Sequence, residues 1–221
     1  MYFSRIRPQP DTAYHTLSGL GGYREHQILW KLFETAPEAK RDFLYRREDH
    51  EGWPVFYLIS KRAPTASPDQ WHIDTKEYKP VLHNGQKLEF SLRVNPVITR
   101  KDASGKSSRS DLVMDIKKQT GWQQQPPNER PSMPEIIEQA GRQWLEQRFE
   151  DHGAQLCTIR AEGYRQHRLH RPGKTPPIRF SSLDLHGTLS IIDPEQFRKI
   201  LFEGIGPAKA FGCGLLLVRR V

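Results

Sequence analysis

The chain has few of the features that mark disulfide-rich, zinc-binding or membrane-spanning proteins. Its 221 residues include only two cysteines, Cys157 and Cys213, which are too few and too far apart for a disulfide framework or a C-x-x-C zinc site. The N-terminus MYFSRIRPQP lacks the apolar segment of a signal peptide, and no apolar run reaches the roughly 18 residues needed to cross a bilayer. We therefore expect a cytoplasmic protein in which both cysteines are small core or strand residues.

The charge of the chain favours an anionic partner. Its 34 Lys and Arg residues outnumber the 26 Asp and Glu residues, which gives a net charge of +8 and a pI of about 9.6. An excess of that size attracts polyanions through long-range steering and counterion release. Nucleic acid is therefore the favoured class of partner, ahead of an acidic membrane surface, and we expect no membrane partner.

The first hundred residues have the pattern of one ferredoxin-like unit. MYFSRIRP at 1–8 alternates as a strand does, and YREHQILWKLFE at 23–34 places its apolar residues on one face of a helix. Strands rich in aromatic and β-branched residues are predicted to follow at 42–49, 54–62 and 87–100. Because the order β-α-β-β-β is that of a ferredoxin-like half, residues 1–100 are interpreted as an N-terminal domain.

The rest of the chain predicts a linker and a second domain. Residues 101–131 are polar and rich in glycine and proline, which is typical of a mobile insertion or linker. Residues 132–221 begin with a helix whose Ser132 and Glu135 form a capping-box pattern, and a short helix starts at Asp193. The prediction is an α+β fold of two tandem ferredoxin-like (RRM-like) domains, with antiparallel sheets and helices on one face. The second domain can borrow its opening strand from the region before residue 131.

Two short motifs are weak signals for a bound cofactor. Gly105-Lys106-Ser107 resembles part of a phosphate-binding loop, but Arg100 stands where that loop needs its first glycine. His167 and His170 have a spacing that two metal ligands can have, but no third ligand is spaced to join them. We therefore expect no nucleotide cofactor and no metal.

A basic arm between residues 160 and 179 is the strongest signal for nucleic acid. Its long cationic side chains suit contacts with phosphates, and Tyr164 or a histidine could stack on a base. The alternative is a solvated basic surface without a ligand. The residues of the arm expected to bind RNA are Arg160, Arg165, Arg168, Arg171 and Lys174.

Tyr23 and His26 are candidate catalytic residues at the start of the first helix. Their three-residue spacing places both on one helical face, away from the apolar Leu29 and Phe33. Histidine transfers protons near neutral pH, whereas tyrosine, with an unperturbed pKa of about 10, needs help to act as a base. The alternative is a purely structural aromatic beside a structural histidine.

The segment GIGPAKAFGCG at 204–214 combines four glycines with Lys209. Glycine permits the positive φ of a helix stop and the close approach of a neighbouring chain. Backbone amides and a lysine could hold a phosphate, but the same glycines could let the loop pack against the facing half. We favour packing between the halves and keep Lys209 as a candidate phosphate contact. The glycines in question are Gly204, Gly206, Gly212 and Gly214.

Three stretches resemble one known family, the CRISPR repeat-cleaving endoribonucleases of type I-E systems. YREHQILWKLF at 23–33 is similar to the family's helix motif, and LRVNP at 92–96 is similar to its Leu-Arg-Ala-Asn-Pro. FSSLDLHGTLSIIDPEQF at 180–197, with the glycine segment 204–214 after it, resembles the end of the family's chain. The usual basic cluster after Asn95-Pro96 is dispersed here, which leaves the contribution of three cations open: Lys101, Lys106 and Arg109.

The resemblance implies an activity and partners. In this family a CRISPR repeat hairpin is the substrate, and its own 2′-hydroxyl attacks the adjacent phosphorus without a metal, leaving a 2′,3′-cyclic phosphate. By position in the motif His26 would be the general acid, and Tyr23 would orient or help deprotonate the nucleophile. Lys31 is a weak candidate for stabilising the phosphate charge. The product would stay bound as the protein remains a subunit of the effector complex.

Two other functions are compatible with the sequence. The first is a catalytically silent subunit that binds repeat RNA, with Tyr23 and His26 in structural roles. The second is a general RRM-like binder of single-stranded RNA, which needs exposed aromatic residues on a sheet face. The aromatic residues are scattered along the sequence, which disfavours the second.

Overall fold

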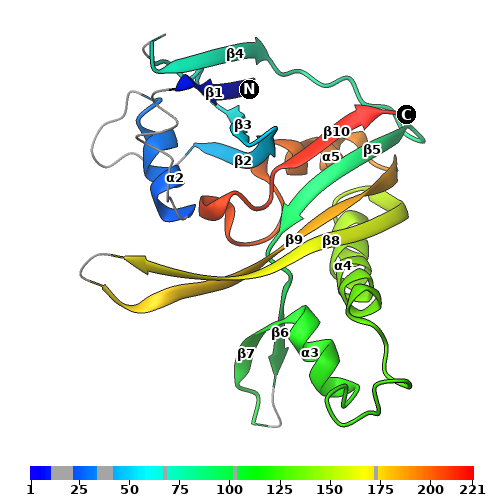
Figure 1. Ribbon diagram of the computed structural model, residues 1–221. Coiled ribbons are helices and arrows are strands. Elements are labelled where there is room, and N and C mark those ends of the chain that lie inside the picture. The colour runs from blue at the N-terminus through cyan, green and yellow to red at the C-terminus, as the bar shows by residue number, and fades with distance from the viewer. Residues whose placement is uncertain (11–21, 34–41, 67–68, 102–103, 172–173) are drawn as a thin grey trace.

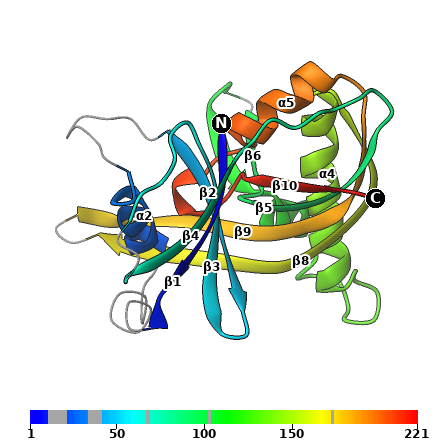
Figure 2. The ribbon, with the colours of Figure 1, turned by 90° about the horizontal axis from the view of Figure 1, so that it is seen from above.

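The computed structural model describes residues 1–10, 22–33, 42–66, 69–101, 104–171 and 174–221. Two four-stranded antiparallel sheets form the body of the molecule, and a small two-stranded sheet lies apart from them at one end (Figure 1). Seen from above, strands of the two large sheets cross one another, and α2 lies beside the long β8–β9 hairpin (Figure 2).

The first sheet contains the N-terminal strands in the order β2-β3-β1-β4, all antiparallel. The turn between β2 and β3 has positive φ at both central residues, Glu51 (53°) and Gly52 (83°), as a tight two-residue hairpin requires. Among the described residues, no helix connects β3 to β4. The elements of this unit are β1 (Tyr2–Pro8), α2 (Gly22–Trp30), β2 (Phe43–His50), β3 (Trp53–Ser60) and β4 (Trp71–Glu77).

The second sheet has the equivalent order, β10-β5-β9-β8. Its helices α4 and α5 share one apolar core with it, so this unit is a complete βαββαβ ferredoxin-like arrangement. The elements are β5 (Lys87–Val94), α4 (Met133–Glu150), β8 (Ala154–Arg171), β9 (Lys174–Ile191), α5 (Pro194–Glu203) and β10 (Leu216–Arg220).

The boundary at residue 100 is wrong because it places β5 in the first domain, whereas the expected borrowing of an opening strand by the second domain from before residue 131 is confirmed. The alternating Leu88, Phe90, Leu92 and Val94 identify a strand, but β5 pairs with β9 and β10 of the second sheet. The first sheet is completed instead by β4, which the sequence pattern did not reveal because its outward residues are mostly polar or charged. The change of unit therefore falls between β4 and β5 rather than at residue 100.

The expected linker at 101–131 is wrong for residues 107–119, which form β7 (Ser107–Asp111) and α3 (Leu112–Gln119), whereas residues 120–131 contain neither helix nor strand. β7 pairs with β6 (Val97–Lys101) as a hairpin. Asp111 caps α3 by accepting from the backbone N of Met114 at 2.9 Å, and its carboxylate also accepts from the Ser181 hydroxyl of β9. Leu112 and Val113 are fully buried in the core shared with α4. A short apolar stripe was thus enough to fold a segment of polar composition.

The core has three parts, of which two position the site. One lies between α2 and the first sheet, where Leu29 packs near Phe43, Tyr45 and Phe56. Another lies between the two large sheets and includes Leu44, Ile59 and Leu215. Because Leu44 and Tyr45 are adjacent on β2, this strand carries α2 on one face and the second domain on the other.

Several local signals in the sequence are confirmed. Ser132 and Glu135 form both bonds of the capping box, and Asp193 caps α5 by accepting from two backbone amides. Gly204 ends α5 with a φ of 72°. Within the part of the chain that the structure describes, no helix is long and apolar enough to span a membrane.

Candidate nucleic-acid interface and catalytic helix

The candidate catalytic residues lie in the first two turns of α2. Tyr23 precedes His26 by three residues in this helix, but its side chain lies outside the described part of the structure. The His26 ring is partly exposed and packs against Trp30, edge to face at 5.6 Å between centroids, and against Phe43 at 6.1 Å. These contacts fix one side of the imidazole against the first domain and leave part of it accessible. Because Phe43 also stacks on Phe33, His26 borders the apolar face of α2, and the expectation that it lies away from that face is wrong.

The glycine segment returns to this region as a short 3-10 helix, η2 (Lys209–Phe211), which contacts both α2 and β2. The Tyr45 hydroxyl of β2 donates to the carbonyl oxygen of Ala210 at 3.2 Å. The backbone N of Gly214 donates to the carbonyl oxygen of Arg93 in β5 at 2.7 Å. The segment is therefore bonded to both halves of the protein, next to α2 (Figure 1).

Its four candidate glycines have positive φ, and each is closely approached by neighbouring atoms. A Cβ on Gly204 would lie 2.8 Å from the Leu44 side chain, and one on Gly206 would lie 2.7 Å from the Trp144 ring. A Cβ on Gly212 would lie 3.3 Å from the Tyr45 ring. These glycines thus allow the loop to pack between β2 of the first domain and α4 of the second.

Lys209 has a structural partner. Its Nζ donates to the carbonyl oxygen of Glu203, the last residue of α5, at 2.8 Å. A cation at this position satisfies a helix-end carbonyl and interacts favourably with the helix dipole. The structure therefore gives Lys209 a capping role, and contact with a phosphate would use its remaining donors.

A polar cleft of about 450 Å³ lies where α2, the end of β2, η2 and the β8–β9 hairpin meet. Arg165 and His167 line it from β8, and Phe211 lines it from η2. Most of its charges are already compensated, because Arg47 and Arg93 pair with carboxylates in or beside the cleft. Among the described residues, by contrast, no carboxylate forms an ion pair with the exposed Arg165. The acidic residues that line the cleft are Glu25, Glu48, Asp49 and Asp184.

A stack of three rings forms one wall of this cleft. His167 stacks on Phe180 at 4.5 Å between centroids, and Phe180 stacks on Phe211 at 4.9 Å. The Nε2 atom of His167 is 2.8 Å from the Ser182 hydroxyl. Burial, together with the positive charges of Arg93 and Arg165, lowers the pKa of His167 below its usual value. His167 is thus a neutral ring that joins the hairpin to the glycine segment at neutral pH.

The β8–β9 hairpin carries the basic arm, and its two faces differ. Arg165, His167 and Leu169 face the cleft with Phe180 and Ser182. Strand alternation puts Arg168 on the opposite face, where its cross-strand partner is Arg179. The hairpin extends past α2 in both views, so the arm and α2 lie close together (Figures 1 and 2).

The remaining predicted RNA-binding residues of the arm differ in their surroundings. Arg160 is highly exposed and forms an ion pair with Glu162 at 3.0 Å. Arg171 and Lys174 are paired positions at the end of the hairpin, and their side chains lie outside the described part of the structure. Sequence reasoning assigned no role in the site to Arg47, Arg93, Phe180 or Phe211, although the last three lie in stretches that carry the family resemblance, because their partners are distant in the chain.

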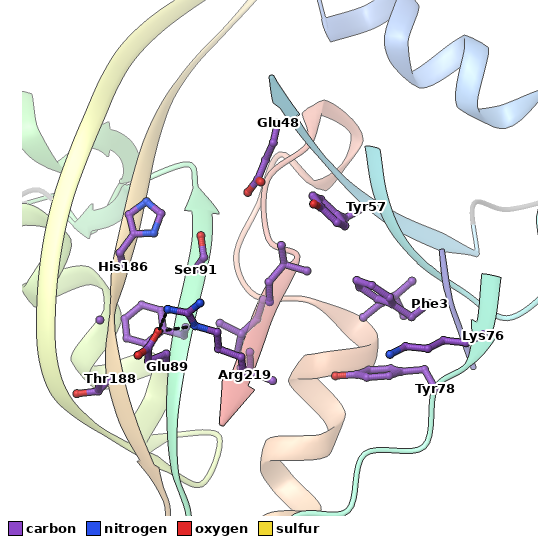
Figure 3. A pocket seen from close by; sticks show the side chains of 16 residues that line it. Phe3, Glu48, Tyr57, Lys76, Tyr78, Glu89, Ser91, His186, Thr188 and Arg219 are labelled. Carbon is purple, nitrogen blue, oxygen red and sulfur yellow. Dashed lines mark hydrogen bonds and ion pairs between the residues drawn. The ribbon is translucent and has the colours of Figure 1, made fainter. Parts of the chain in front are cut away.

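A larger groove of about 820 Å³ lies elsewhere, between the facing surfaces of the two large sheets (Figure 3). Phe3 on β1 and Tyr57 on β3 stack there at 6.1 Å, so aromatic residues scattered in the sequence do gather on a sheet face. However, Tyr78 also packs on Phe3, and the groove contains the Glu89–Arg219 ion pair. Its other cation, Lys76, lies over the Phe3 ring at 5.9 Å, and the groove lies on the face of the first sheet opposite α2.

Neither cysteine takes part in these sites. Cys157 is exposed, and Cys213 is buried, which raises the pKa of its thiol to about 12. Within the described ranges, no group of three or more His, Cys, Asp or Glu residues is arranged to hold a metal ion.

Comparison with known proteins decides the family. The chain matches the family model described as CRISPR associated protein over residues 1–220. The chain belongs to this CRISPR-associated family. Among relatives of the family, the chain is 32% identical to the CRISPR system Cascade subunit CasE of Escherichia coli (strain K12), covering 88% of this chain and 89% of the relative.

Two further comparisons concern the Cse3 members of the family. The chain is 28% identical to the CRISPR-associated endoribonuclease Cse3 of Thermus thermophilus, with 89% of each covered. A structure of CRISPR endoribonuclease Cse3 bound to 19 nt RNA superposes with a TM-score of 0.72 at 25% identity, covering 99% of this chain and all of the other. The resemblance seen in the sequence and the tandem ferredoxin-like fold are confirmed.

Proposed function

We propose that the protein is an endoribonuclease that cleaves CRISPR precursor RNA at the repeat hairpin. The observation that carries this proposal is the meeting of α2 with the basic β8–β9 hairpin at one cleft, which Glu25, the neighbour of His26 in the chain, lines from α2. The relatives support the chemistry, since one is an endoribonuclease and a solved Cse3 structure contains RNA. Catalytic and binding groups thus come from different halves of the chain.

The proposed reaction is an internal transesterification. The RNA 2′-oxygen bonds to the adjacent phosphorus, the bond from phosphorus to the 5′-oxygen breaks, and a 2′,3′-cyclic phosphate and a 5′-hydroxyl result. His26 donates a proton to the departing 5′-oxygen, and Tyr23 orients the 2′-hydroxyl or helps remove its proton. General acid–base assistance of this kind contributes typically 10²–10⁴-fold, and alignment of the attacking oxygen adds to it.

The charge distribution supports binding of the RNA by the hairpin. Arg165 faces the cleft, where it can stabilise charge that develops on the phosphate. Arg168 and Arg179 present a second pair of cations on the other face. Arg160, Arg171 and Lys174 extend the same basic strands, and Lys209 stays a candidate contact through its remaining donors.

We further propose that the reaction uses neither a metal nor a nucleotide cofactor, because a 2′-hydroxyl nucleophile with a histidine acid can proceed by proton transfer alone. The protein would act in the cytoplasm and remain bound to its product as a subunit of an effector complex. That last part is supported by the relative named as a Cascade subunit.

A cleavage assay with His26→Ala tests the proposal. Wild-type protein should cut a repeat hairpin once, at the 3′ base of the stem, and the variant should lose about 100-fold or more of the rate. Binding of the hairpin should stay within a few-fold, because His26 is not part of the basic arm. His83→Ala, at an exposed turn in another part of the chain, is the matched control. A His26→Ala rate close to that of the control would contradict the assigned role.

The alternative is a subunit that binds repeat RNA without cutting it. Tight binding by the wild-type protein with no product at any pH between about 6 and 9 would favour this alternative. If His26 and Tyr23 transfer protons, at least one of them should be active in that pH range, and product should form.

A further inference from the structure

A buried ion pair ties the first turns of α2 to the first sheet. Glu25 immediately precedes His26 and is only 8% exposed. Its Oε1 accepts a hydrogen bond from Nη1 of Arg47 in β2 at 2.5 Å. Burying a carboxylate is costly unless it is paired, so this contact fixes the side of α2 that faces the sheet.

Arg47 is itself held in place by two further contacts. Its Nε and Nη2 donate to Oδ1 of Asp49 at 3.0 and 2.9 Å. Its backbone carbonyl oxygen accepts from Nη1 of Arg93 at 3.1 Å. Burial alone would lower the pKa of Arg47, but the hydrogen bonds to Glu25 and Asp49 raise it above the ordinary value. The guanidinium is therefore a charged anchor with a defined orientation.

Arg93 continues this connection into the second domain. Its Nε and Nη2 donate to the two carboxylate oxygens of Asp184 in β9 at 2.7 and 2.8 Å, a bidentate pair. Asp184 faces Gly163, at the bulge of β8 between Glu162 and Arg165. A continuous chain of charge-assisted contacts thus runs from α2 through β2 and β5 to the base of the basic hairpin.

We propose that Glu25 and Arg47 are positioning residues for cleavage, because their ion pair sets the rotation of α2 relative to the RNA held by the β8–β9 hairpin. This inference rests on the proposed function of His26. General acid catalysis needs donor and acceptor heavy atoms about 2.6–3.2 Å apart. A displacement of about 1 Å costs on the order of 100-fold in rate. Both side chains line the cleft but are paired with each other within the protein, so we expect RNA affinity to change much less than the cleavage rate when the pair is altered.

The test compares Glu25→Gln and Arg47→Lys with Asp115→Asn. Asp115 is the matched control, since it is a largely buried helix carboxylate paired with a strand arginine, Arg100, at 2.6 Å. Three quantities are measured: the single-turnover cleavage rate at saturating protein, the Kd for a repeat RNA with deoxyribose at the cut site, and the thermal midpoint.

We expect Glu25→Gln to lose about 10- to 100-fold in cleavage rate while its Kd for RNA stays within a few-fold of wild type. Asp115→Asn should keep the wild-type rate. The double variant Glu25→Gln with Arg47→Lys should lose no more than the slower single variant, because both changes break one interaction. If the ion pair had only a structural role, the variants would have a lower thermal midpoint, but the cleavage rate would not fall more than the RNA affinity does.

Two results would overturn the proposal. One is a rate for both single variants equal to that of Asp115→Asn. The other is a loss of cleavage rate that is no larger than the loss of RNA affinity or of folded protein. If Glu25→Gln does not fold, Arg47→Lys retains a cation and decides the question by the same measurements. Failure of the proposed function would give a different result from failure of the positioning role. In that case the wild type would not cleave the RNA, or His26→Ala would still cleave it.

Discussion

Arg168 of β8 and Arg179 of β9 lie directly opposite each other, and both side chains are exposed. Like charges that face each other across two strands destabilise a sheet by roughly 0.2–1 kcal/mol. In the described part of the chain, no carboxylate forms an ion pair with either residue. An anion between the two guanidinium groups would relieve this repulsion, which supports contact with a phosphate.

Replacing both arginines by alanine should weaken RNA binding without lowering the stability of the protein. Loss of two phosphate contacts should reduce the slope of log K against log salt by about 1–2. The free energy of unfolding should stay the same or rise by up to about 1 kcal/mol, because the repulsion is removed. Titrations at several salt concentrations and urea unfolding measure both. Arg142→Ala on α4, where the arginine pairs with Glu146, is the control that should leave the salt slope unchanged.

Chelation should leave cleavage unaffected. If His26 supplies the leaving-group proton and the 2′-hydroxyl is the nucleophile, the single-turnover rate in excess EDTA should equal the rate in buffer alone. Product analysis should show a 2′,3′-cyclic phosphate. Cleavage that stops in EDTA and returns with Mg²⁺ would refute the metal-independent mechanism.

Gly206→Ala should lower the free energy of unfolding by more than backbone strain alone would lower it. Gly206 has a φ of 77°, and its new Cβ would lie 2.7 Å from the ring of Trp144, which is 1% exposed and has no room to move. Overpacking of this kind typically costs about 1–3 kcal/mol beyond the strain. Gly85→Ala is the matched control, because its φ is 75° but no atom lies within 4 Å of the added Cβ. Equal losses in urea unfolding for the two variants would show that the loop does not pack tightly on α4.

The stability of the protein should depend on pH through His167. Its pKa is lowered by burial and by Arg93 and Arg165, so the unfolded chain binds a proton more readily than the folded one. The stabilisation that comes from His167 being neutral in the folded protein is fully present above the pKa of histidine in the unfolded chain, about 6.5. It is lost as the pH falls below that value.

The variant His167→Phe retains a ring that can stack on Phe180 but does not titrate. We expect its thermal midpoint to fall less than that of the wild type when the pH is lowered from about 7.5 to 5.5. His83→Gln, at an exposed site, serves as the control. If the thermal midpoint of His167→Phe fell as steeply with pH as that of the wild type, the pKa of His167 would be the same in the folded and unfolded protein.

Local features of the fold were predictable because short stretches of sequence decide them. Ser132 and Glu135 stand three residues apart, which is sufficient for the capping box that begins α4. The position of Tyr23 and His26 on α2 likewise followed from helical spacing. Their proposed roles remain predictions, because they depend on a bound RNA.

The contents of the site were harder to predict, because they come from distant parts of the chain. The ion pair of Glu25 with Arg47 joins residues 22 positions apart, and that of Arg93 with Asp184 joins residues 91 apart. No local pattern marks such partners. The ring stack of His167, Phe180 and Phe211 is similarly invisible until β8, β9 and η2 are brought together.

The sequence by itself determined the positions of most strands and helices, their caps and the basic character of the long hairpin, since these follow from periodicity and from side chains acting on neighbouring backbone. Only the tertiary structure decided that β5 is the strand which the second sheet borrows and that residues 107–119 fold as a strand and a helix. It also decided that the glycine segment packs beside α2. The physical reason is that strand pairing and burial depend on contacts between residues far apart in the chain, where several partners satisfy the same local pattern.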